Sequence, residues 1–400
     1  MVGQRQLVTL SAHILVVLFV LLIAARPAQA QTESILYPFA CTNGGGGACT
    51  PWEGVVLDKG GNVYGTTTEG GTSALGVIFK VTPSGAFSTL YNFCSASECA
   101  DGGWPIYGLV IDKEGNLYGA TVYGGAFANG TVFKVTPSGT ETVLYNFTSS
   151  YSIYYAQPNL ALDSKGNLYG VTPDTFSIFK LTPSGTYSTL YTFCSAPNCA
   201  DGNEPLGGVI LDKLDNLYGT TKFGGANGLG IVFKLTPSGT ETVLHSFDAN
   251  GEDGFYPEAG VILDSKDNIY GTTTLGGKIG VGSVFEVTAS GTETILYSFA
   301  AGADGFSPYA SLVFDKKHNL YGTTAYGGSY GSGTVFEVTP KGVETVLHSF
   351  ERNGTDGYFP ATGLAINAAG DLYGTTTDGG SGKGTACVPN GCGVVFKVIP

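Results

Sequence analysis

The chain has 400 residues and a net charge of −13 at pH 7, from 32 acidic and 19 basic side chains. A protein this acidic repels phosphate backbones, so we expect no nucleic-acid partner. Its eight cysteines are an even number, which favours disulfide bonds in an exported chain.

Residues 1–30 have the pattern of a secretory signal peptide. Arg5 supplies the positive charge, residues 14–24 form an apolar stretch, and Ala-Gln-Ala at 28–30 is a small-x-small cleavage site before Gln31. The apolar stretch is too short to favour a retained membrane span. We therefore expect no membrane span in the mature chain 31–400, and a secreted, extracellular location, with the periplasm as an alternative.

The rest of the chain consists of seven tandem copies of one sequence repeat. Its marker tyrosine recurs at intervals of about 51 residues, the spacing of stacked or radial repeats, at Tyr64, Tyr118, Tyr169, Tyr218, Tyr270, Tyr321 and Tyr373. Each repeat has four short runs rich in β-branched and aromatic residues, which predict an antiparallel four-stranded sheet. In the second repeat we expect strands A to D at Gly108–Asp112, Asn116–Thr121, Thr131–Thr136 and Glu141–Phe147.

Two of the connections within a repeat are tight turns and two are long loops. The A–B turn follows an acidic residue such as Asp112 and has a slot, filled by Gly, Asp or His, that suits positive φ. The C–D turn is Thr-Pro-Ser-Gly in four copies. The B–C loop carries a Gly-Gly pair and the D–A loop carries Asp-Gly-x-x-Pro. Because both long loops leave the same ends of the strands, we expect them on one rim.

The ends of the chain predict how the repeats close. The seventh copy stops after its C strand, at Val394–Val398, whereas Glu33–Phe39 matches the D-strand template. An open solenoid would need capping repeats, and none is present. We therefore predict an all-β, seven-bladed β-propeller of four-stranded antiparallel blades, in which the N-terminal strand completes the last blade. We expect a monomer with residues 31–400 as a single domain.

The repeat resembles a known family in four of its segments. These are Asn-Leu-Tyr-Gly-Thr-Thr, the Gly-Gly pair, Val-Phe-Lys-Val-Thr-Pro-Ser-Gly and Glu-Thr-Val-Leu-Tyr-Ser-Phe, which are similar to the GloVer tandem repeat of exported bacterial choice-of-anchor proteins. The resemblance covers residues 33–400 and implies a surface or secreted location and a propeller-like fold, but no activity. Members often end in a sorting domain, which this chain lacks, so we expect release. A weaker likeness is to NHL and gluconolactonase-type blades.

The cysteines fall into four local pairs on the long-loop rim. Their spacing is wider than Cys-x-x-Cys and no histidine accompanies them, so we expect disulfides and no metal. The predicted bonds are Cys41–Cys49, Cys94–Cys99, Cys194–Cys199 and Cys387–Cys392.

Few residues are candidates for catalysis. His245 and His348 replace a strand D tyrosine and His318 fills a turn slot, so a Ser-His-Asp triad is not expected. Glu53 and Glu258 are weak candidates for a carboxylate pair in the central channel, and Asn159 would join them in a lactonase-like metal site. They sit at different registers of their strands, which predicts that they point apart. We expect no cofactor.

The aspartates of Asp-Gly-x-x-Pro have two interpretations. They could form a ring of Ca²⁺ ligands, or each could cap its own loop. One carboxylate followed by glycine is a poor calcium pattern, so capping is favoured.

Aromatic residues of the long-loop rim are the candidate ligand-binding groups: Trp52, Trp104, Tyr107, Tyr309 and Tyr155. The alternative is that they wedge between blades. Trp52 and Trp104 are the ones expected to be exposed. Blade 3 lacks Asp-Gly-x-x-Pro and the Gly-Gly pair, which predicts a notch in the rim there.

These patterns favour a secreted, non-enzymatic propeller that binds an extracellular polysaccharide or surface protein through its long-loop rim. One alternative is a hydrolase or lyase acting on sugars or lactones in the central channel. Another is a purely structural matrix component.

Overall fold

The computed structural model describes residues 32–41, 47–148, 160–172, 175–360, 362–382 and 390–400. The fold set out below is that of residues 33–400, which form one compact unit. No helix in these segments has the length and apolar character of a transmembrane span. Their only helices are three single-turn 3₁₀ segments, η1 (Ser97–Cys99), η2 (Pro197–Cys199) and η3 (Gly302–Asp304).

Four strands recur in every repeat, close to the predicted positions. The A strands are β4 (Val56–Leu57), β9 (Val110–Ile111), β13 (Ala161–Leu162), β17 (Val209–Leu211), β22 (Ile262–Leu263), β27 (Val313–Phe314) and β32 (Ala365–Ile366). The B strands are β5 (Val63–Thr67), β10 (Leu117–Ala120), β14 (Leu168–Thr172), β18 (Leu217–Thr221), β23 (Ile269–Thr273), β28 (Leu320–Thr324) and β33 (Leu372–Thr376). The C strands are β7 (Val77–Val81), β11 (Thr131–Val135), β15 (Ser177–Leu181), β19 (Ile231–Leu235), β25 (Ser283–Val287), β29 (Thr334–Val338) and β35 (Val394–Ile399). The D strands are β8 (Phe87–Asn92), β12 (Glu141–Asn146), β16 (Tyr187–Thr192), β20 (Glu241–Ser246), β26 (Glu293–Ser298), β30 (Glu344–Ser349) and β1 (Thr32–Pro38).

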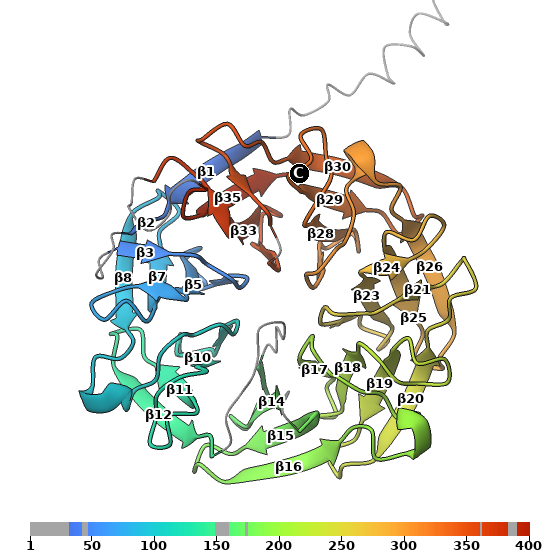
Figure 1. Ribbon diagram of the computed structural model, residues 1–400, viewed down its shortest axis with the longest axis horizontal. Helices are drawn as coiled ribbons and strands as arrows, with labels where there is room; N and C mark the ends of the chain where they lie inside the picture. Colours follow the sequence, from blue (N-terminus) through green and yellow to red (C-terminus); the bar gives the residue numbers. More distant parts are fainter. Residues whose placement is uncertain (1–31, 42–46, 149–159, 173–174, 361, 383–389) are drawn as a thin grey trace, which may run out of the picture. The chain divides into compact units, whose positions relative to one another are not determined.

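These strands form seven antiparallel four-stranded sheets that follow one another around a ring (Figure 1). In the last sheet the order is β1-β35-β33-β32, so the N-terminal strand pairs with the last strand of the chain. Just beyond β1, the backbone N–H of Phe39 donates to the Gly393 carbonyl at 2.9 Å. The predicted seven-bladed propeller and its closure are both confirmed.

The tight turns have the predicted chemistry. Asp112 Oδ1 accepts the backbone N–H groups of Glu114 and Asn116, and its Oδ2 accepts Asn116 Nδ2 and the Tyr118 hydroxyl. The slot that precedes the Asn116 position has positive φ throughout, including 64° at Asp215 and 63° at His318. These carboxylates are therefore occupied in holding turns.

The two long loops of neighbouring blades pair with one another. β21 (Gly254–Phe255) of a D–A loop pairs with β24 (Leu275–Gly276) of the next B–C loop. The same pairing joins β31 (Gly357–Tyr358) to β34 (Asp378–Gly379), and β3 (Gly47–Cys49), itself paired with β2 (Ala40–Cys41), to β6 (Glu69–Gly70). Both kinds of loop thus lie on one rim, as expected.

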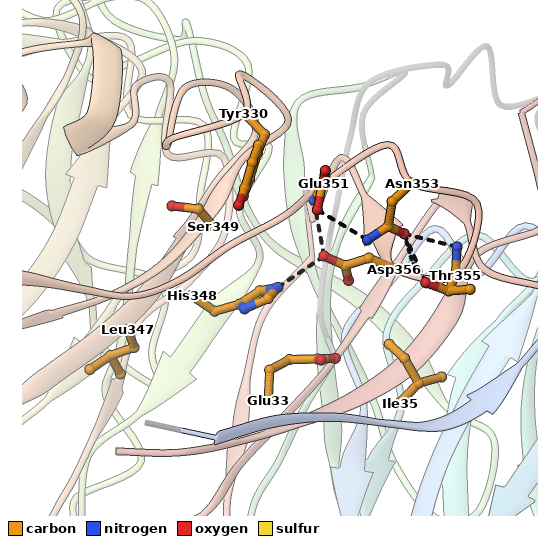
Figure 2. Close-up of a pocket in the computed structure, with 10 residues that line it drawn as sticks. All are labelled: Glu33, Ile35, Tyr330, Leu347, His348, Ser349, Glu351, Asn353, Thr355 and Asp356. Atoms are coloured by element: carbon orange, nitrogen blue, oxygen red, sulfur yellow. Dashed lines mark hydrogen bonds and ion pairs between the residues drawn. The ribbon is translucent and has the colours of Figure 1, made fainter. Parts of the chain in front are cut away.

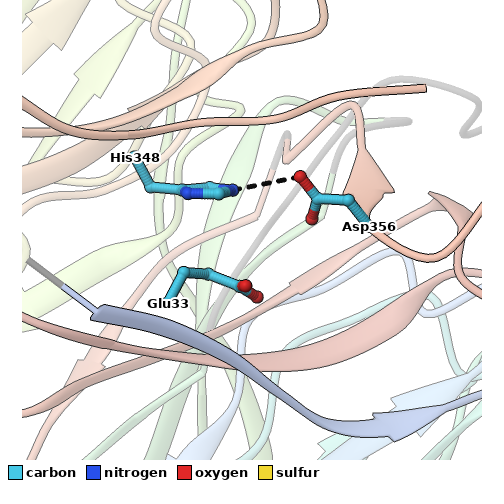
Figure 3. A group of neighbouring side chains, drawn as sticks. All are labelled: Glu33, His348 and Asp356. Atoms are coloured by element: carbon cyan, nitrogen blue, oxygen red, sulfur yellow. Dashed lines mark hydrogen bonds and ion pairs between the residues drawn. The ribbon is translucent and has the colours of Figure 1, made fainter. Parts of the chain in front are cut away.

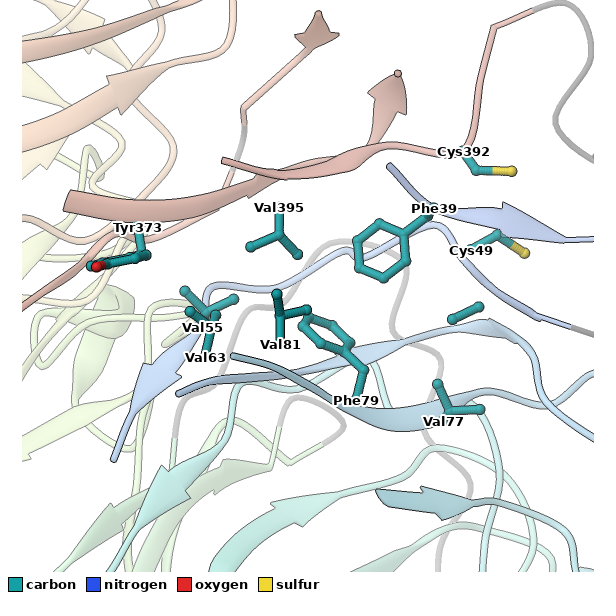
Figure 4. Close-up of a cluster of buried hydrophobic side chains, with 11 residues drawn as sticks. Phe39, Cys49, Val55, Val63, Val77, Phe79, Val81, Tyr373, Cys392 and Val395 are labelled. Atoms are coloured by element: carbon teal, nitrogen blue, oxygen red, sulfur yellow. The ribbon is translucent and has the colours of Figure 1, made fainter. Parts of the chain in front are cut away.

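The hydrophobic core lies between the blades. At each of the seven junctions, a phenylalanine that follows a D strand packs on a phenylalanine of the next blade's C strand, with ring centroids 4.8 to 6.1 Å apart. At the closing junction Phe39 and Phe79 are fully buried beside Val395 (Figure 4). Closing the ring therefore buries the same pair of rings as every other junction.

The D strands contain a β-bulge that the sequence analysis did not foresee. In blade 2, Val132 faces Tyr145 and Phe133 faces Val143, so Leu144 is the extra residue, and the equivalent shift occurs in blades 1 to 6. An extra residue reverses the alternation of side chains along a strand. Glu141 and Tyr145 would share one face of a regular strand, but here they face opposite neighbouring blades.

Two of the predicted disulfides, Cys94–Cys99 and Cys194–Cys199, are present in D–A loops. Cys49 and Cys392 are also disulfide-bonded. Their predicted partners, Cys41 and Cys387, have side chains outside the described residues, so these two pairings stay predictions.

We expect that Gly119→Ala lowers the free energy of unfolding by about 1–3 kcal/mol, because a Cβ atom there would lie 2.5 Å from Phe133 Cζ and 3.0 Å from Leu109 Cδ2. Urea unfolding measures the change. Gly363→Ala is the control, since its Cβ would meet only the Ser311 carbonyl oxygen at 3.9 Å. Equal losses in the two variants would contradict the steric explanation.

Candidate functional site

A buried acidic network lies between blades 3 and 4. Asp201, from the D–A loop, accepts the Tyr191 hydroxyl at 2.8 Å and the backbone N–H groups of Ser195 and Ala196 at 2.9 and 3.2 Å. Glu241, at the start of β20 in the next blade, faces the same carboxylate. Burial, together with the nearby Asp201 charge, raises the pKa of Glu241 to about 7.

This network recurs at five of the seven junctions. Each has a strand D tyrosine or histidine, a D–A loop aspartate, and a glutamate that starts the next D strand, and burial raises the pKa of every one of these glutamates. The aspartate–glutamate pairs are Asp101–Glu141, Asp201–Glu241, Asp253–Glu293, Asp304–Glu344 and Asp356–Glu33.

In the sequence, the other two junctions have neither the loop aspartate nor the glutamate. There an aromatic ring replaces the glutamate and stacks on the strand D tyrosine of the previous blade. The pairs are Tyr37–Phe87, with centroids 4.2 Å apart, and Tyr145–Tyr187, at 4.6 Å. The aspartate and glutamate are therefore present together or absent together within this one chain, which indicates that they act as a unit.

Histidine replaces tyrosine at two of the acidic junctions. His245 Nε2 lies 3.1 Å from Asp253 Oδ2, with Glu293 beside them, and His348 Nε2 lies 3.2 Å from Asp356 Oδ2. Figure 3 shows Glu33 reaching from β1 toward His348 and Asp356. In both groups the three side chains offer ligand atoms within 4.8 Å of one another.

The junction between blades 6 and 7 also carries a pocket of about 450 Å³ (Figure 2). Its lining residues are Glu33, Ile35, Tyr330, Leu347, His348, Ser349, Glu351, Asn353, Thr355 and Asp356. Asn353 Oδ1 accepts the backbone N–H groups of Thr355 and Asp356, and the Glu351 N–H donates to Asp356 Oδ2. The pocket therefore gives access to the His348 group past a hydrogen-bonded loop.

The long-loop rim presents side chains from a fixed backbone. Trp104 has φ of 53°, its N–H donates to the Leu75 carbonyl of the previous blade, and its own carbonyl accepts the Val122 N–H. The residue before proline has positive φ in six D–A loops: Thr50, Trp104, Glu204, Tyr256, Ser307 and Phe359. Backbone hydrogen bonds to neighbouring loops hold this conformation. The type of side chain at the position can therefore differ from one loop to the next.

Several of these side chains form aromatic pairs with the residue before Gly-Gly. Trp104 and Tyr123 have ring centroids 5.6 Å apart, and both are exposed, at 46% and 39%. Similar pairs join Phe223 to Tyr256 and Tyr326 to Phe359.

The predicted binding residues have different surroundings. Trp52 and Trp104 are exposed, as expected, whereas Tyr107 is buried between blades at 4% exposure, the alternative weighed for such residues. Tyr309 is half-buried, and burial together with the neighbouring Glu258 carboxylate raises its pKa. Tyr155 lies outside the described residues, as does most of the expected notch in blade 3.

The two candidate catalytic carboxylates are engaged at different junctions. Glu53 is buried, which raises its pKa well above the usual value, and its backbone carbonyl accepts the Thr375 hydroxyl of blade 7 at 2.9 Å. Glu258 forms an ion pair with Lys222 at 3.1 Å. Asn159 lies outside the described residues.

The loop aspartates accept hydrogen bonds from their own loops, as the capping interpretation expected. Each also faces a glutamate of the next blade, and this contact was not predicted from the sequence. From the sequence, His245 and His348 were interpreted only as replacements of the strand D tyrosine. A usable signal was the motif His-Ser-Phe-x-x-Asn-Gly-x-Asp-Gly, which occurs at 245–254 and 348–357.

Comparisons with solved structures support the fold. The chain is similar to virginiamycin B lyase from Staphylococcus aureus, with 12% identity, a TM-score of 0.58, and coverage of 92% of this chain and 99% of that one. It is also similar to part of the extracellular domain of the hybrid two-component system BT4673 from B. thetaiotaomicron, with 11% identity, a TM-score of 0.56, and coverage of 90% and 39%. At such identities the likeness concerns the fold alone.

Sequence comparison gives two results. No curated protein matches the chain. A family model described as the Gloeobacter/Verrucomicrobia repeat matches residues 22–177 and 174–387.

Proposed function

Because the chain belongs to the Gloeobacter/Verrucomicrobia repeat family and folds as a closed propeller, we propose that it is an exported, non-enzymatic protein that binds an extracellular polysaccharide on its long-loop rim. Export is supported by the disulfides Cys94–Cys99 and Cys194–Cys199, which persist in oxidising compartments, together with the leader pattern of residues 1–30.

The observation that carries this proposal is the exposed Trp104–Tyr123 pair. The CH faces of sugar rings stack on flat aromatic rings, and tyrosine and tryptophan add a polar group that can bond sugar hydroxyls. Backbone hydrogen bonds from two blades hold the strained φ of Trp104, so binding does not have to order the backbone that carries the indole.

The hydrolase or lyase alternative has less support. It needs Glu53 and Glu258 to act together, but Glu53 is buried against blade 7 and Glu258 pairs with Lys222 of blade 4. A general acid and base must both reach the same substrate.

A panel of cell-wall and extracellular polysaccharides tests the proposal by affinity electrophoresis. We expect the purified mature protein to be retarded by at least one polymer, and the double variant Trp104→Ala/Tyr123→Ala to bind it at least tenfold more weakly, about 1.4 kcal/mol. The control is Leu214→Ala, which removes an exposed side chain from an A–B turn at the other ends of the strands. Unchanged affinity in the double variant, or no binding to any polymer, would contradict the proposal.

A further inference from the structure

The two histidine junctions differ from the tyrosine junctions in one respect that bears on ligand binding. At the tyrosine junctions both oxygens of Asp101, Asp201 and Asp304 accept hydrogen bonds. At the histidine junctions the Oδ1 atoms of Asp253 and Asp356 are buried and have no hydrogen-bond partner. The orphan aspartate oxygen therefore accompanies the imidazole.

These orphan atoms belong to side chains that are almost completely enclosed. The side chains of Asp253 and Asp356 are 7% and 10% exposed. The facing Oε1 atoms of Glu293 and Glu33 are also buried without a partner, as are those of the glutamates at the tyrosine junctions, so the aspartate oxygen is what sets the histidine junctions apart. A buried carboxylate oxygen without a partner is unfavourable, and a cation at this position would satisfy both acids at once.

We propose that each histidine junction binds a divalent transition-metal ion of the Zn²⁺ class, one through His245, Asp253 and Glu293 and the other through His348, Asp356 and Glu33. An imidazole nitrogen with two carboxylate oxygens suits such an ion, whereas Ca²⁺ prefers six to eight oxygen ligands.

The geometry agrees with shared coordination. Two ligands that each lie about 2.0–2.1 Å from a tetrahedral zinc ion are about 3.3–3.4 Å apart. His245 Nε2 and Asp253 Oδ2 are separated by 3.1 Å, and His348 Nε2 and Asp356 Oδ2 by 3.2 Å. Backbone N–H groups of Asp248 and Glu351 bind the same aspartates and fix their orientation, as second-shell groups do in metal sites.

The ligands of each ion come from two blades, so the metal adds to the apolar packing and to the hydrogen bonds that already join these neighbours, such as the one from the Tyr256 N–H to the Leu229 carbonyl. At the junction between blades 6 and 7 it joins the N-terminal strand, through Glu33, to the loop that carries Asp356. The pocket beside that site gives water access to the remaining coordination positions.

Zinc titration of the untagged, chelator-treated mature protein tests this inference. We expect two Zn²⁺ ions per chain by calorimetry and by metal analysis of the desalted protein. His245→Tyr and His348→Tyr should each bind one ion fewer, and the double variant none. Tyrosine occupies the same strand position at Tyr91, Tyr191 and Tyr297, so these variants are expected to fold, which circular dichroism checks.

Two variants serve as matched controls. Glu241→Gln alters a tyrosine junction and His318→Asn removes the remaining described histidine, so both should still bind two ions. Zn²⁺ should raise the melting temperature of the wild type and of both controls, but not that of the double tyrosine variant. Absence of zinc binding by the wild type, or two ions still bound by the folded double variant, would overturn the inference.

Discussion

Replacing Phe39 with alanine is expected to lower the free energy of unfolding by about 3–5 kcal/mol, the cost of removing a large ring from a core. The Phe39 ring is fully buried and packs on Phe79 and Phe87 of blade 1 at 5.1 and 6.3 Å between centroids. Phe39 follows β1, so the alanine variant leaves a cavity at the junction where the two ends of the chain meet. Urea unfolding followed by tryptophan fluorescence measures the loss.

Phe127→Ala is the matched control, because that ring is 57% exposed and its removal should change the stability by less than about 0.5 kcal/mol. A chain that begins at Ala40 should lose more than the point variant and aggregate, since it leaves β35 as an unpaired edge. A loss below 1 kcal/mol for Phe39→Ala would show that the closing junction contributes little.

The triple variant Glu141→Gln/Glu241→Gln/Glu344→Gln is expected to remove much of a decline in stability between pH 5 and 8. Burial raises the pKa of Glu141 and Glu241 to about 7 and that of Glu344 to about 8. Their usual value is 4.5, so between these limits the folded protein holds protons that the unfolded chain has released. Stability therefore falls as pH rises through this window.

Glutamine resembles the protonated acid and does not ionise. At pH 8.5 the triple variant should be more stable than the wild type by about 1–2 kcal/mol per junction, once the partial exposure of these groups is allowed for. At pH 5 the two proteins should differ little. The measurement is the urea midpoint as a function of pH, with chelator present so that the histidine junctions hold no ion.

The loop aspartates affect stability in a different pH range, so they do not obscure the decline caused by the glutamates. Burial disfavours the charged form of Asp201, but hydrogen bonds from Ser195, Tyr191 and the Ala196 backbone together outweigh it and lower the pKa. The stability that Asp201 contributes is therefore lost only in acid, as pH falls through that lowered value. Glu98→Gln, which changes an exposed carboxylate outside the acid pairs, is the control and should keep the decline. Equal pH profiles for the wild type and the triple variant would contradict the assignment.

The aromatic residues of the rim show how much of the candidate site could be predicted from the sequence. Exposure was predicted for the two tryptophans because they lie at variable positions of the rim next to cystine loops, and Trp52 and Trp104 are exposed. Tyr107 has the same loop context and is buried, because its position beside an A strand turns it toward the next blade. Local composition indicates a loop, but not which side of it meets solvent.

The residue pattern was enough to identify the repeat, the four strands of each blade, the two kinds of turn, and Glu33–Phe39 as the strand that completes the last blade. These follow from preferences that act within a few residues, such as positive φ at Asp215, and from one template that can be matched at both ends of the chain. Which charged groups meet depends instead on how the blades pack against one another. Glu293 reaches Asp253 and His245 because a bulge reverses the side-chain alternation of its strand and because blades 4 and 5 pack face to face. Neither the bulge nor the packing is encoded by a local pattern, so the acidic junctions emerge only when the ring is assembled.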